Sequence, residues 1–273
     1  MLSGGLRIKG ITKHSKENMP LITVVTVVRN GEKTLEETIL SVINQTYKNV
    51  EYIVVDGAST DGTLDIIRKY EDKIDYWMSE SDKGIYYAMN KGIDLAYGDW
   101  INFMNSGDSF YKSDVIENIN TIKDSYSDVV YGNTNVCFKG YSIKKQSKLP
   151  SDKEYMPFCH QAALVKRSIA QKWPFDVSYK ICADKDFFHK IYFAKYKFQY
   201  LPFIICNYEG EQGLSAQQGE NLIKEAAFID NRNAKRKWII CHRVSIISFK
   251  VKKIIKKCLP SYVVMKIQKL KQL

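Results

Sequence analysis

The sequence predicts an α/β protein in which helices flank a central, mostly parallel sheet. Continuous apolar runs rich in β-branched residues recur along the first hundred residues, which is typical of strands buried on both faces. Between them lie segments whose apolar residues are three or four positions apart, which is typical of amphipathic helices. Strands that alternate with helices in this way form parallel sheets with helices on both sides.

This alternation gives each predicted element a place in the chain. Strands are predicted at residues 21–28, 50–55, 74–78, 100–104 and 128–131. Helices are predicted at residues 32–46, 63–70, 85–96, 183–196 and 217–237. The polar, weakly periodic stretch at 133–157 predicts a hairpin with a mobile loop. Pro202 interrupts a further apolar run at 198–206, so we expect an edge strand or a bulge there.

Charge divides the chain more clearly than hydrophobicity does. The net charge is +11, but residues 231–273 hold 13 of the 41 Lys and Arg residues and no Asp or Glu. The other 28 basic residues face 30 acidic ones, which leaves a net charge of −2 on the rest of the chain. We therefore expect an N-terminal extension over 1–19, one globular domain over 20–230, and a basic helical tail over 231–273.

The tail has the pattern of an amphipathic helix. Apolar residues from Val244 to Cys258 fall near one face, and lysines form another row. Such a helix suits an anionic membrane surface, although a helix packed on the protein body is the alternative. Nucleic-acid binding is the weaker interpretation, because basic residues cluster only here and no RNA-binding motif is present. We expect no nucleic-acid partner.

Other features of the sequence predict the compartment. The first 19 residues lack the apolar core of a signal peptide, and no run of about 18 apolar residues occurs. The six Cys residues form no CxxC pair and no zinc pattern, so free thiols are expected. We therefore expect a cytoplasmic protein that lies peripherally on the inner face of the cytoplasmic membrane.

Three acidic loops punctuated by glycine follow apolar runs, and they contain Asp56, Asp82 and Asp108. In open α/β sheets, ligands bind at the edge where the parallel strands end. Carboxylate-bearing loops on that edge can hold a sugar nucleotide and a metal on its diphosphate. The chain contains neither a dinucleotide fingerprint after its first strand nor a P-loop, so a divalent cation is the natural partner for phosphates.

Two of these carboxylates have specific candidate roles. Asp56 directly follows a buried strand and could accept the imide N–H of a uracil, whereas the alternative is an ordinary turn. Asp108 lies beside Gly107 in a loop that we expect to be exposed, and it is the best candidate for binding Mg2+ or Mn2+. The alternative for Asp108 is a turn that leads into a helix.

In addition to the three loops, two acidic residues begin the helix predicted at 183–196. Asp184 could act as a general base that takes the proton of an attacking sugar hydroxyl, or it could cap the helix. Asp186 lies two positions further along and points elsewhere on a helix, which favours a cap or a pairing with Lys.

In their order and spacing, these segments resemble a family 2 glycosyltransferase with the GT-A fold. The resemblance is greatest to short bacterial enzymes of capsule, exopolysaccharide and lipopolysaccharide assembly. It covers about 70% of the chain, over residues 22–30, the Asp56 loop, 82–86, 88–92, the Asp108 loop, 160–161 and 183–186.

The resemblance implies a role for each matching residue. On the donor side, the nucleotide-sugar-binding residues would be Thr26, Asn30, Asp56, Asp82, Lys83 and Asn105. Asp108 would hold the metal, and Asp184 would be the catalytic base. On the acceptor side, the resemblance implies His160, Gln161 and Asp186.

The implied activity is inverting, metal-dependent transfer of one sugar from a nucleotide-sugar donor, a UDP-sugar, in cell-surface polysaccharide synthesis. The acceptor would be a saccharide or a lipid-linked saccharide, and the cofactor Mn2+ or Mg2+. Three departures from the family pattern matter. Asn105 and Gly107 replace acids of the DxDD motif, and the usual acidic pair at the base position is Ala183-Asp184. No QxxRW motif is recognisable at 212–215, which favours transfer of a single sugar. The competing hypothesis is a non-catalytic, membrane-docked subunit that binds nucleotide sugars or serves in assembly.

Overall fold

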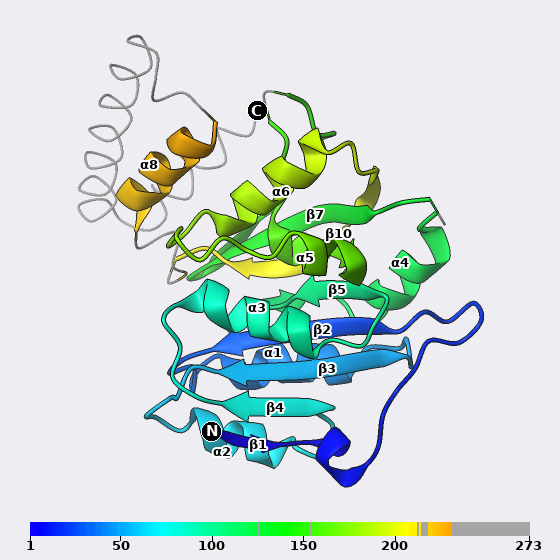
Figure 1. Cartoon of the computed structure of the whole chain (residues 1–273), viewed down its shortest axis with the longest axis vertical. Helices are drawn as coiled ribbons and strands as arrows, with labels where there is room; N and C mark the ends of the chain where they lie inside the picture. The colour runs from blue at the N-terminus through cyan, green and yellow to red at the C-terminus, as the bar shows by residue number, and fades with distance from the viewer. Residues whose placement is uncertain (125, 153, 212, 214–217, 231–273) are drawn as a thin grey trace.

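The fold is a ten-stranded sheet with helices on both faces, seen in a computed structural model that describes residues 1–230 except 125, 153, 212 and 214–217 (Figure 1). The strands are β1 Leu2–Gly4, β2 Ile22–Val28, β3 Val50–Asp56, β4 Tyr76–Ser79, β5 Trp100–Phe103, β6 Ser109–Phe110, β7 Val129–Phe138, β8 Tyr141–Lys145, β9 Ala163–Lys166 and β10 Phe198–Glu209. The helices are α1 Leu35–Ile43, α2 Thr63–Lys69, α3 Ile85–Leu95, α4 Val115–Ile122, α5 Arg167–Lys172, α6 Ala183–Phe193 and α8 Gly219–Ile229, with 3-10 turns η1 Leu6–Lys9 and η2 His160–Ala162.

The sheet is mixed, which corrects the expectation of a mostly parallel one. Its strand order is β1-β4-β3-β2-β5-β9-β7-β10-β6, with β8 paired to β7. Strands β2 to β5 pair in parallel, as their intervening helices require. Strand β9 then runs antiparallel to both of its neighbours, β5 and β7, and the outer pairings of β1, β6 and β8 are antiparallel too. The alternation of strands and helices that predicts a parallel sheet holds only for the first half of the chain.

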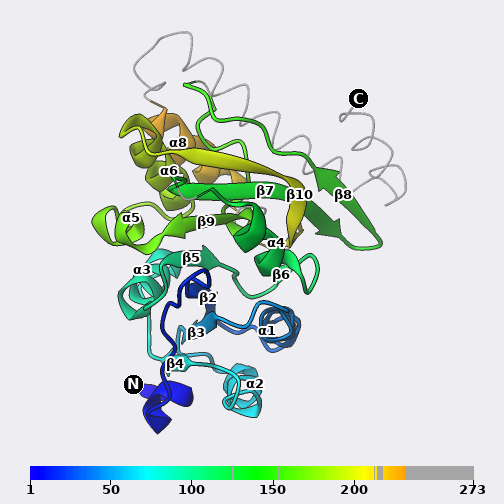
Figure 2. The same ribbon diagram turned by 90° about the vertical axis from the view of Figure 1, so that its right-hand side faces the viewer.

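Side-chain alternation along the central strands builds a core on each face of the sheet. In β2, Val24 packs with α1, α2 and α4 on one face, whereas Val25 and Val27 pack with α3, α5 and α6 on the other. Figure 2 shows α1 and α2 on one side of the sheet and α3 and α5 on the opposite side. Every residue of β2 and β3 is buried, as the continuous apolar runs predict.

The outer elements add detail that the sequence pattern does not show. Residues 2–4 pair with β4 at the edge of the sheet, so part of the predicted N-terminal extension belongs to the sheet. The predicted hairpin is formed by β7 and β8, and the register of β10 on β7 shifts between Tyr200 and Cys206, around the predicted Pro202 irregularity. The predicted helix at 217–237 is described only as α8, and the predicted tail lies outside the described residues. Within the described part, no helix is long and apolar enough to cross a membrane.

Candidate active site

A cleft with a volume of about 1280 Å³ opens where β2, β3, β4 and β5 end. Four chain segments form most of its wall: residues 29–34 after β2, 82–89 at the start of α3, 105–108 after β5, and 158–161 around η2. Asp184, in the first turn of α6, closes another side. The cleft therefore lies at the carboxyl edge of the parallel strands, where the acidic loops predict it.

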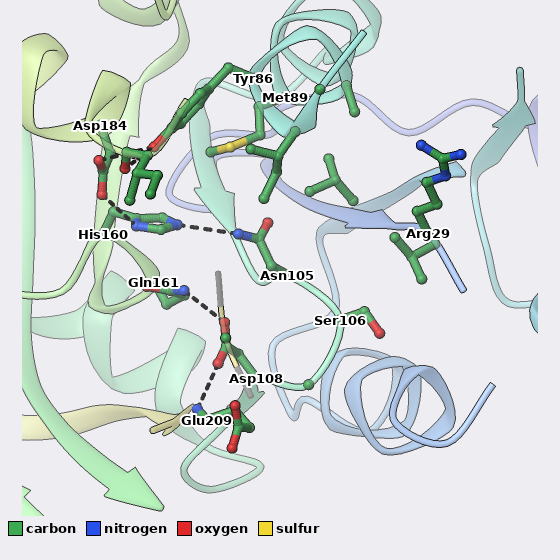
Figure 3. A pocket seen from close by; sticks show the side chains of 18 of the residues that line it. Arg29, Tyr86, Met89, Asn105, Ser106, Asp108, His160, Gln161, Asp184 and Glu209 are labelled. Atoms are coloured by element: carbon green, nitrogen blue, oxygen red, sulfur yellow. Dashed lines mark hydrogen bonds and ion pairs between the residues drawn. The ribbon is translucent and has the colours of Figure 1, made fainter. Parts of the chain in front are cut away.

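On one side of the cleft, Asp184 forms a small polar group with His160 and Tyr86 (Figure 3). His160 Nδ1 lies 3.0 Å from Asp184 Oδ2, and the Tyr86 hydroxyl lies 3.2 Å from Asp184 Oδ1. Burial raises the pKa of Tyr86 well above its ordinary value, so its hydroxyl keeps its hydrogen. The backbone N–H of Lys185 donates to Asp184 Oδ1 at 2.8 Å. Asp184 is thus an oriented carboxylate that borders the cleft.

A second carboxylate of the cleft wall, that of Asp108, is buried, which corrects the expectation of an exposed loop carboxylate. Only 4% of the residue is exposed. Its Oδ2 accepts from Gln161 Nε2 at 2.7 Å, and its Oδ1 accepts from the backbone N–H of Glu209 at 2.9 Å. Burial raises the pKa of Asp108 to about 6, because a carboxylate away from water loses solvation. Gly107 has a φ of +99°, a conformation that favours glycine and forms the turn before Asp108.

The loop at 105–108 offers oxygen atoms that suit a hard cation. Asn105 Oδ1 is buried without a hydrogen-bond partner, and its Nδ2 lies 3.3 Å from His160 Nε2. Within the described ranges, no group of three or more His, Cys, Asp and Glu side chains is placed to hold a metal ion. Mg2+ and Mn2+ commonly use one or two protein oxygens and take the rest from substrate phosphates and water. Asp108 and Asn105 fit that pattern.

Basic side chains border the cleft near the predicted donor loops. Arg29 and Lys83 are exposed and line it. Asp82 also lines it, and this carboxylate forms an ion pair with Lys91 while its other oxygen, Oδ2, is buried without a hydrogen-bond partner. The structure therefore places two cationic side chains, which can attract an anionic ligand, on the cleft wall. Arg29 was not predicted, although it directly precedes Asn30 at the end of a strand.

Three predicted site residues lie outside the cleft wall. Thr26 is fully buried and donates to the backbone carbonyl of Met104 at 2.7 Å, so it is not part of the pocket surface. Asp56 is also fully buried, and it accepts from Ser79 and from the backbone N–H of Ser59. Asp186 pairs with Lys190 within α6 at 2.6 Å. These contacts indicate positioning of the strand, loop and helix rather than direct contact with a ligand in this conformation.

The remaining predicted residues line the cleft. Asn30 has a φ of +54°, and its Oδ1 accepts from the backbone N–H of Thr60 at 2.9 Å, which joins the loops after β2 and β3. His160 and Gln161 are neighbours in η2, yet one contacts Asp184 and the other Asp108. The part played by Glu209 was missed, because it lies 101 positions from Asp108 and contributes only a backbone N–H. No side-chain pattern in the sequence could signal such a contact.

Comparison with known proteins identifies the family. The profile of "Glycosyl transferase family 2" matches residues 23–191, which is more than half of the chain. The chain belongs to glycosyl transferase family 2. This confirms the resemblance found in the sequence and makes the chain a glycosyltransferase. The alternative of a non-catalytic subunit is therefore not retained.

Two similar glycosyltransferases match about half of this chain or more. A PGL/p-HBAD biosynthesis glycosyltransferase of Mycobacterium bovis (strain BCG / Pasteur 1173P2) is 30% identical over 176 residues, which are 62% of this chain and 68% of the relative. TuaG of Bacillus subtilis (strain 168), named for a role in teichuronic acid biosynthesis, is 31% identical over 137 residues, 49% of this chain and 52% of the relative.

Solved structures share the fold. S. aureus TarS 1-349 in complex with UDP-GlcNAc matches with a TM-score of 0.63 and 19% identity, over 77% of this chain and 66% of that one. The mannosyltransferase PcManGT from Pyrobaculum calidifontis, in complex with GDP-Man and Mn2+, matches with a TM-score of 0.59 and 19% identity, over 78% of this chain and 64% of that one. These matches support the predicted GT-A-like α/β architecture.

Proposed function

We propose that this family 2 glycosyltransferase transfers one sugar from a UDP-sugar to a saccharide or lipid-linked saccharide in cell-surface glycan synthesis, with inversion and with Mn2+ or Mg2+. The observation that carries the proposal is that Asp108 and Asp184 line the same cleft and that adjacent residues of η2 hold both carboxylates. Metal-assisted transfer needs a carboxylate near the departing diphosphate and a base near the attacking hydroxyl. A single cleft that contains both carboxylates can assist the departure of the diphosphate and the attack of the hydroxyl.

Asp184 would take the proton from the acceptor hydroxyl as its oxygen bonds to the anomeric carbon. The bond from that carbon to the diphosphate breaks on the opposite side, so one in-line displacement inverts the configuration. Asp108 and Asn105 would hold the cation, which supplies charge stabilisation to the departing diphosphate. Lys83 and Arg29 add positive charge at the cleft surface.

The donor and the pathway are proposed from the relatives. TarS binds UDP-GlcNAc, and PcManGT binds GDP-Man with Mn2+. The similar curated proteins are named for PGL/p-HBAD biosynthesis and for teichuronic acid biosynthesis. UDP is proposed as the nucleotide because the TarS complexes hold UDP and UDP-GlcNAc.

For the site of action, we propose the anionic inner face of the cytoplasmic membrane. The 13 basic residues of the tail would each add about 1 kcal/mol near such a surface. A lipid-linked acceptor would be presented at that surface. Docking would therefore bring the enzyme and its acceptor together.

The test is a donor and acceptor screen with the full chain. Nucleoside diphosphate release is measured with Mn2+, a panel of UDP- and GDP-sugars, and short saccharide or lipid-linked acceptors. We expect one UDP-sugar to support release that depends on acceptor and stops with EDTA, and NMR of the product to show an inverted anomeric centre. A retained configuration, or full transfer in EDTA, would refute the corresponding part of the proposal.

A further inference from the structure

The 3-10 turn η2 contacts both carboxylates of the cleft through two adjacent side chains. His160 reaches Asp184 at 3.0 Å, and Gln161 reaches Asp108 at 2.7 Å (Figure 3). The Gln161 amide is itself held, because its Oε1 accepts from the Cys159 thiol at 2.6 Å. A short, internally bonded turn thus links the two carboxylates on which the proposed chemistry depends.

The contacts of His160 determine which of its nitrogens carries hydrogen. An ionised carboxylate only accepts hydrogen bonds, so Nδ1 must donate to Asp184 Oδ2. Asn105 Nδ2 donates, so Nε2 at 3.3 Å is the acceptor. The imidazole is then neutral, with a fixed tautomer and fixed ring orientation, like the second-layer partners that orient metal-bound or catalytic groups elsewhere.

The effect of this arrangement falls on Asp184. Its Oδ1 is bonded by the Lys185 backbone and lies near the Tyr86 hydroxyl, whereas His160 is the partner of Oδ2. The side chains of His160 and Asp184 are only 17% and 18% exposed, so water replaces a lost partner poorly. Without His160, Oδ2 would lose this partner, and the carboxylate would be held through Oδ1 alone.

We infer that His160 is a positioning residue: its Nδ1–H orients the Asp184 carboxylate toward the acceptor hydroxyl, and its Nε2 joins that base to Asn105 on the donor side. The inference rests on the proposed function, in which Asp184 is the base. It differs from direct contact with the acceptor, the role implied for His160 by the family resemblance. His160 acts through Asp184, so its loss lowers turnover rather than binding.

A matched pair of substitutions separates the two nitrogens. The amide nitrogen of Asn takes about the place of Nδ1, whereas that of Gln takes about the place of Nε2. We expect His160→Gln to lower kcat by about 100-fold, as small misplacements of reacting groups do, with donor and acceptor KM nearly unchanged. His160→Asn keeps a donor toward Asp184 and should recover most of the lost kcat.

A double-mutant cycle tests whether the effect passes through Asp184. If it does, His160→Gln combined with Asp184→Asn should be no slower than Asp184→Asn alone, since the oriented base is already gone. Equal losses in the Asn and Gln variants would overturn the inference, and so would fully additive losses in the cycle. A raised donor KM with normal kcat would also overturn it, by placing His160 in the donor site.

A measurement without substrate keeps this inference separate from the proposed function. Nitrogen-15 NMR of the full chain should show His160 as the neutral Nδ1–H tautomer near neutral pH, and Asp184→Asn should change that resonance markedly. An unchanged resonance would refute the contact whatever the enzyme transfers. A changed resonance together with no sugar transfer from any donor would refute the proposed function and leave the contact established.

Discussion

At the scale of single residues, burial of Asp108 makes its ionisation part of the folding equilibrium. The residue is 4% exposed, and its pKa is raised to about 6, above the value of about 3.9 expected in an unfolded chain. A group whose pKa rises on folding stabilises the fold when protonated, and this contribution disappears as the pH rises through the folded pKa. Here the affected window runs from about pH 4 to about pH 6.

Asp108→Asn should remove this dependence, because an amide does not titrate. Between about pH 4 and pH 6 in EDTA, the free energy of unfolding of the wild type should fall by up to about 3 kcal/mol relative to the variant. Urea titrations at several pH values measure this difference. A constant difference across the window would mean that the carboxyl group titrates normally despite its burial.

Asp184→Asn keeps the shape of the side chain and removes its basicity. Transfer should fall by about 100-fold or more, the contribution of a positioned general base, while donor affinity stays nearly unchanged. Asp186→Asn is the matched control, because Asp186 lies in the same helix but pairs with Lys190 away from the cleft wall. Equal losses in the two variants, with both folded, would contradict the assignment of the base to Asp184.

At the scale of elements, the N-terminal segment is bonded to the sheet more strongly than its sequence indicates. Arg7, in η1, pairs with Glu51 at 2.5 Å, and the Glu51 side chain is only 2% exposed. Arg7 also lies over the ring of Tyr97, with its guanidinium carbon 3.8 Å from the ring centroid. Glu51 further accepts from Thr23 and from the backbone of Tyr97. Glu51 thus connects Arg7, Thr23 and Tyr97, which are distant from one another in the sequence.

Arg7→Ala should destabilise the protein by about 3 kcal/mol, because it leaves the buried Glu51 carboxylate without its cationic partner. Thermal or urea unfolding measures the loss. Lys9→Ala is the control, since Lys9 is exposed in the same turn and should change stability by less than about 0.5 kcal/mol. Similar stability of the two variants would show that the Arg7–Glu51 pair contributes little.

The sequence predicts the elements whose information is local and misses those defined by distant contacts. The central strands β2 and β3 follow from their continuous apolar runs, and α3 follows from its apolar spacing. Strand β6 has only two residues, and β9 gains its identity from pairing with β5 and β7. The mixed character of the sheet depends on those pairings, so local periodicity could not reveal it.

The same distinction holds for the candidate site. Loop position predicts that Asp108 lies at the edge of the sheet where ligands bind, and the family resemblance implies that Asp184 belongs to the same site; both residues line the cleft. The burial of Asp108 depends on Gln161 and Glu209, which come from other parts of the chain. Thr26 lies at a strand position that the family resemblance assigns to the pocket, yet its hydroxyl is used inside the sheet. Side-chain contacts of that kind require the three-dimensional arrangement.

At the scale of the whole molecule, the uneven distribution of charge predicts separate functions for the globular domain and for the basic tail. Truncation after Asn231 removes all 13 basic residues of the tail and leaves a net charge of −2. If the tail docks on lipid, the truncated protein should no longer sediment with anionic vesicles, and it should still transfer sugar to a short soluble acceptor. Binding of the full chain should weaken as salt rises, because the screening length shortens to about 8 Å at physiological ionic strength.

Two outcomes would contradict this role of the tail. Unchanged vesicle binding after truncation would place the membrane contact on another part of the protein. An insoluble truncated protein would mean that the apolar face of the tail covers the enzyme's own surface. Vesicles of neutral lipid serve as the control, since attraction between charges requires an anionic surface.

The hydrogen bond from the backbone N–H of Glu209 to Asp108 also has a consequence for the order of events during synthesis. The first five strands and the loop at 105–108 leave the ribosome about a hundred residues before the partner of Asp108 Oδ1 does. A nascent chain that ends before residue 209 can pair β2 with β3 and β5, but its Asp108 still lacks one of its two donors. The donor side of the cleft is therefore completed only when most of the enzyme has been made. A partly translated chain contains the strands and the 105–108 loop of the site but lacks a donor that fixes the Asp108 carboxylate.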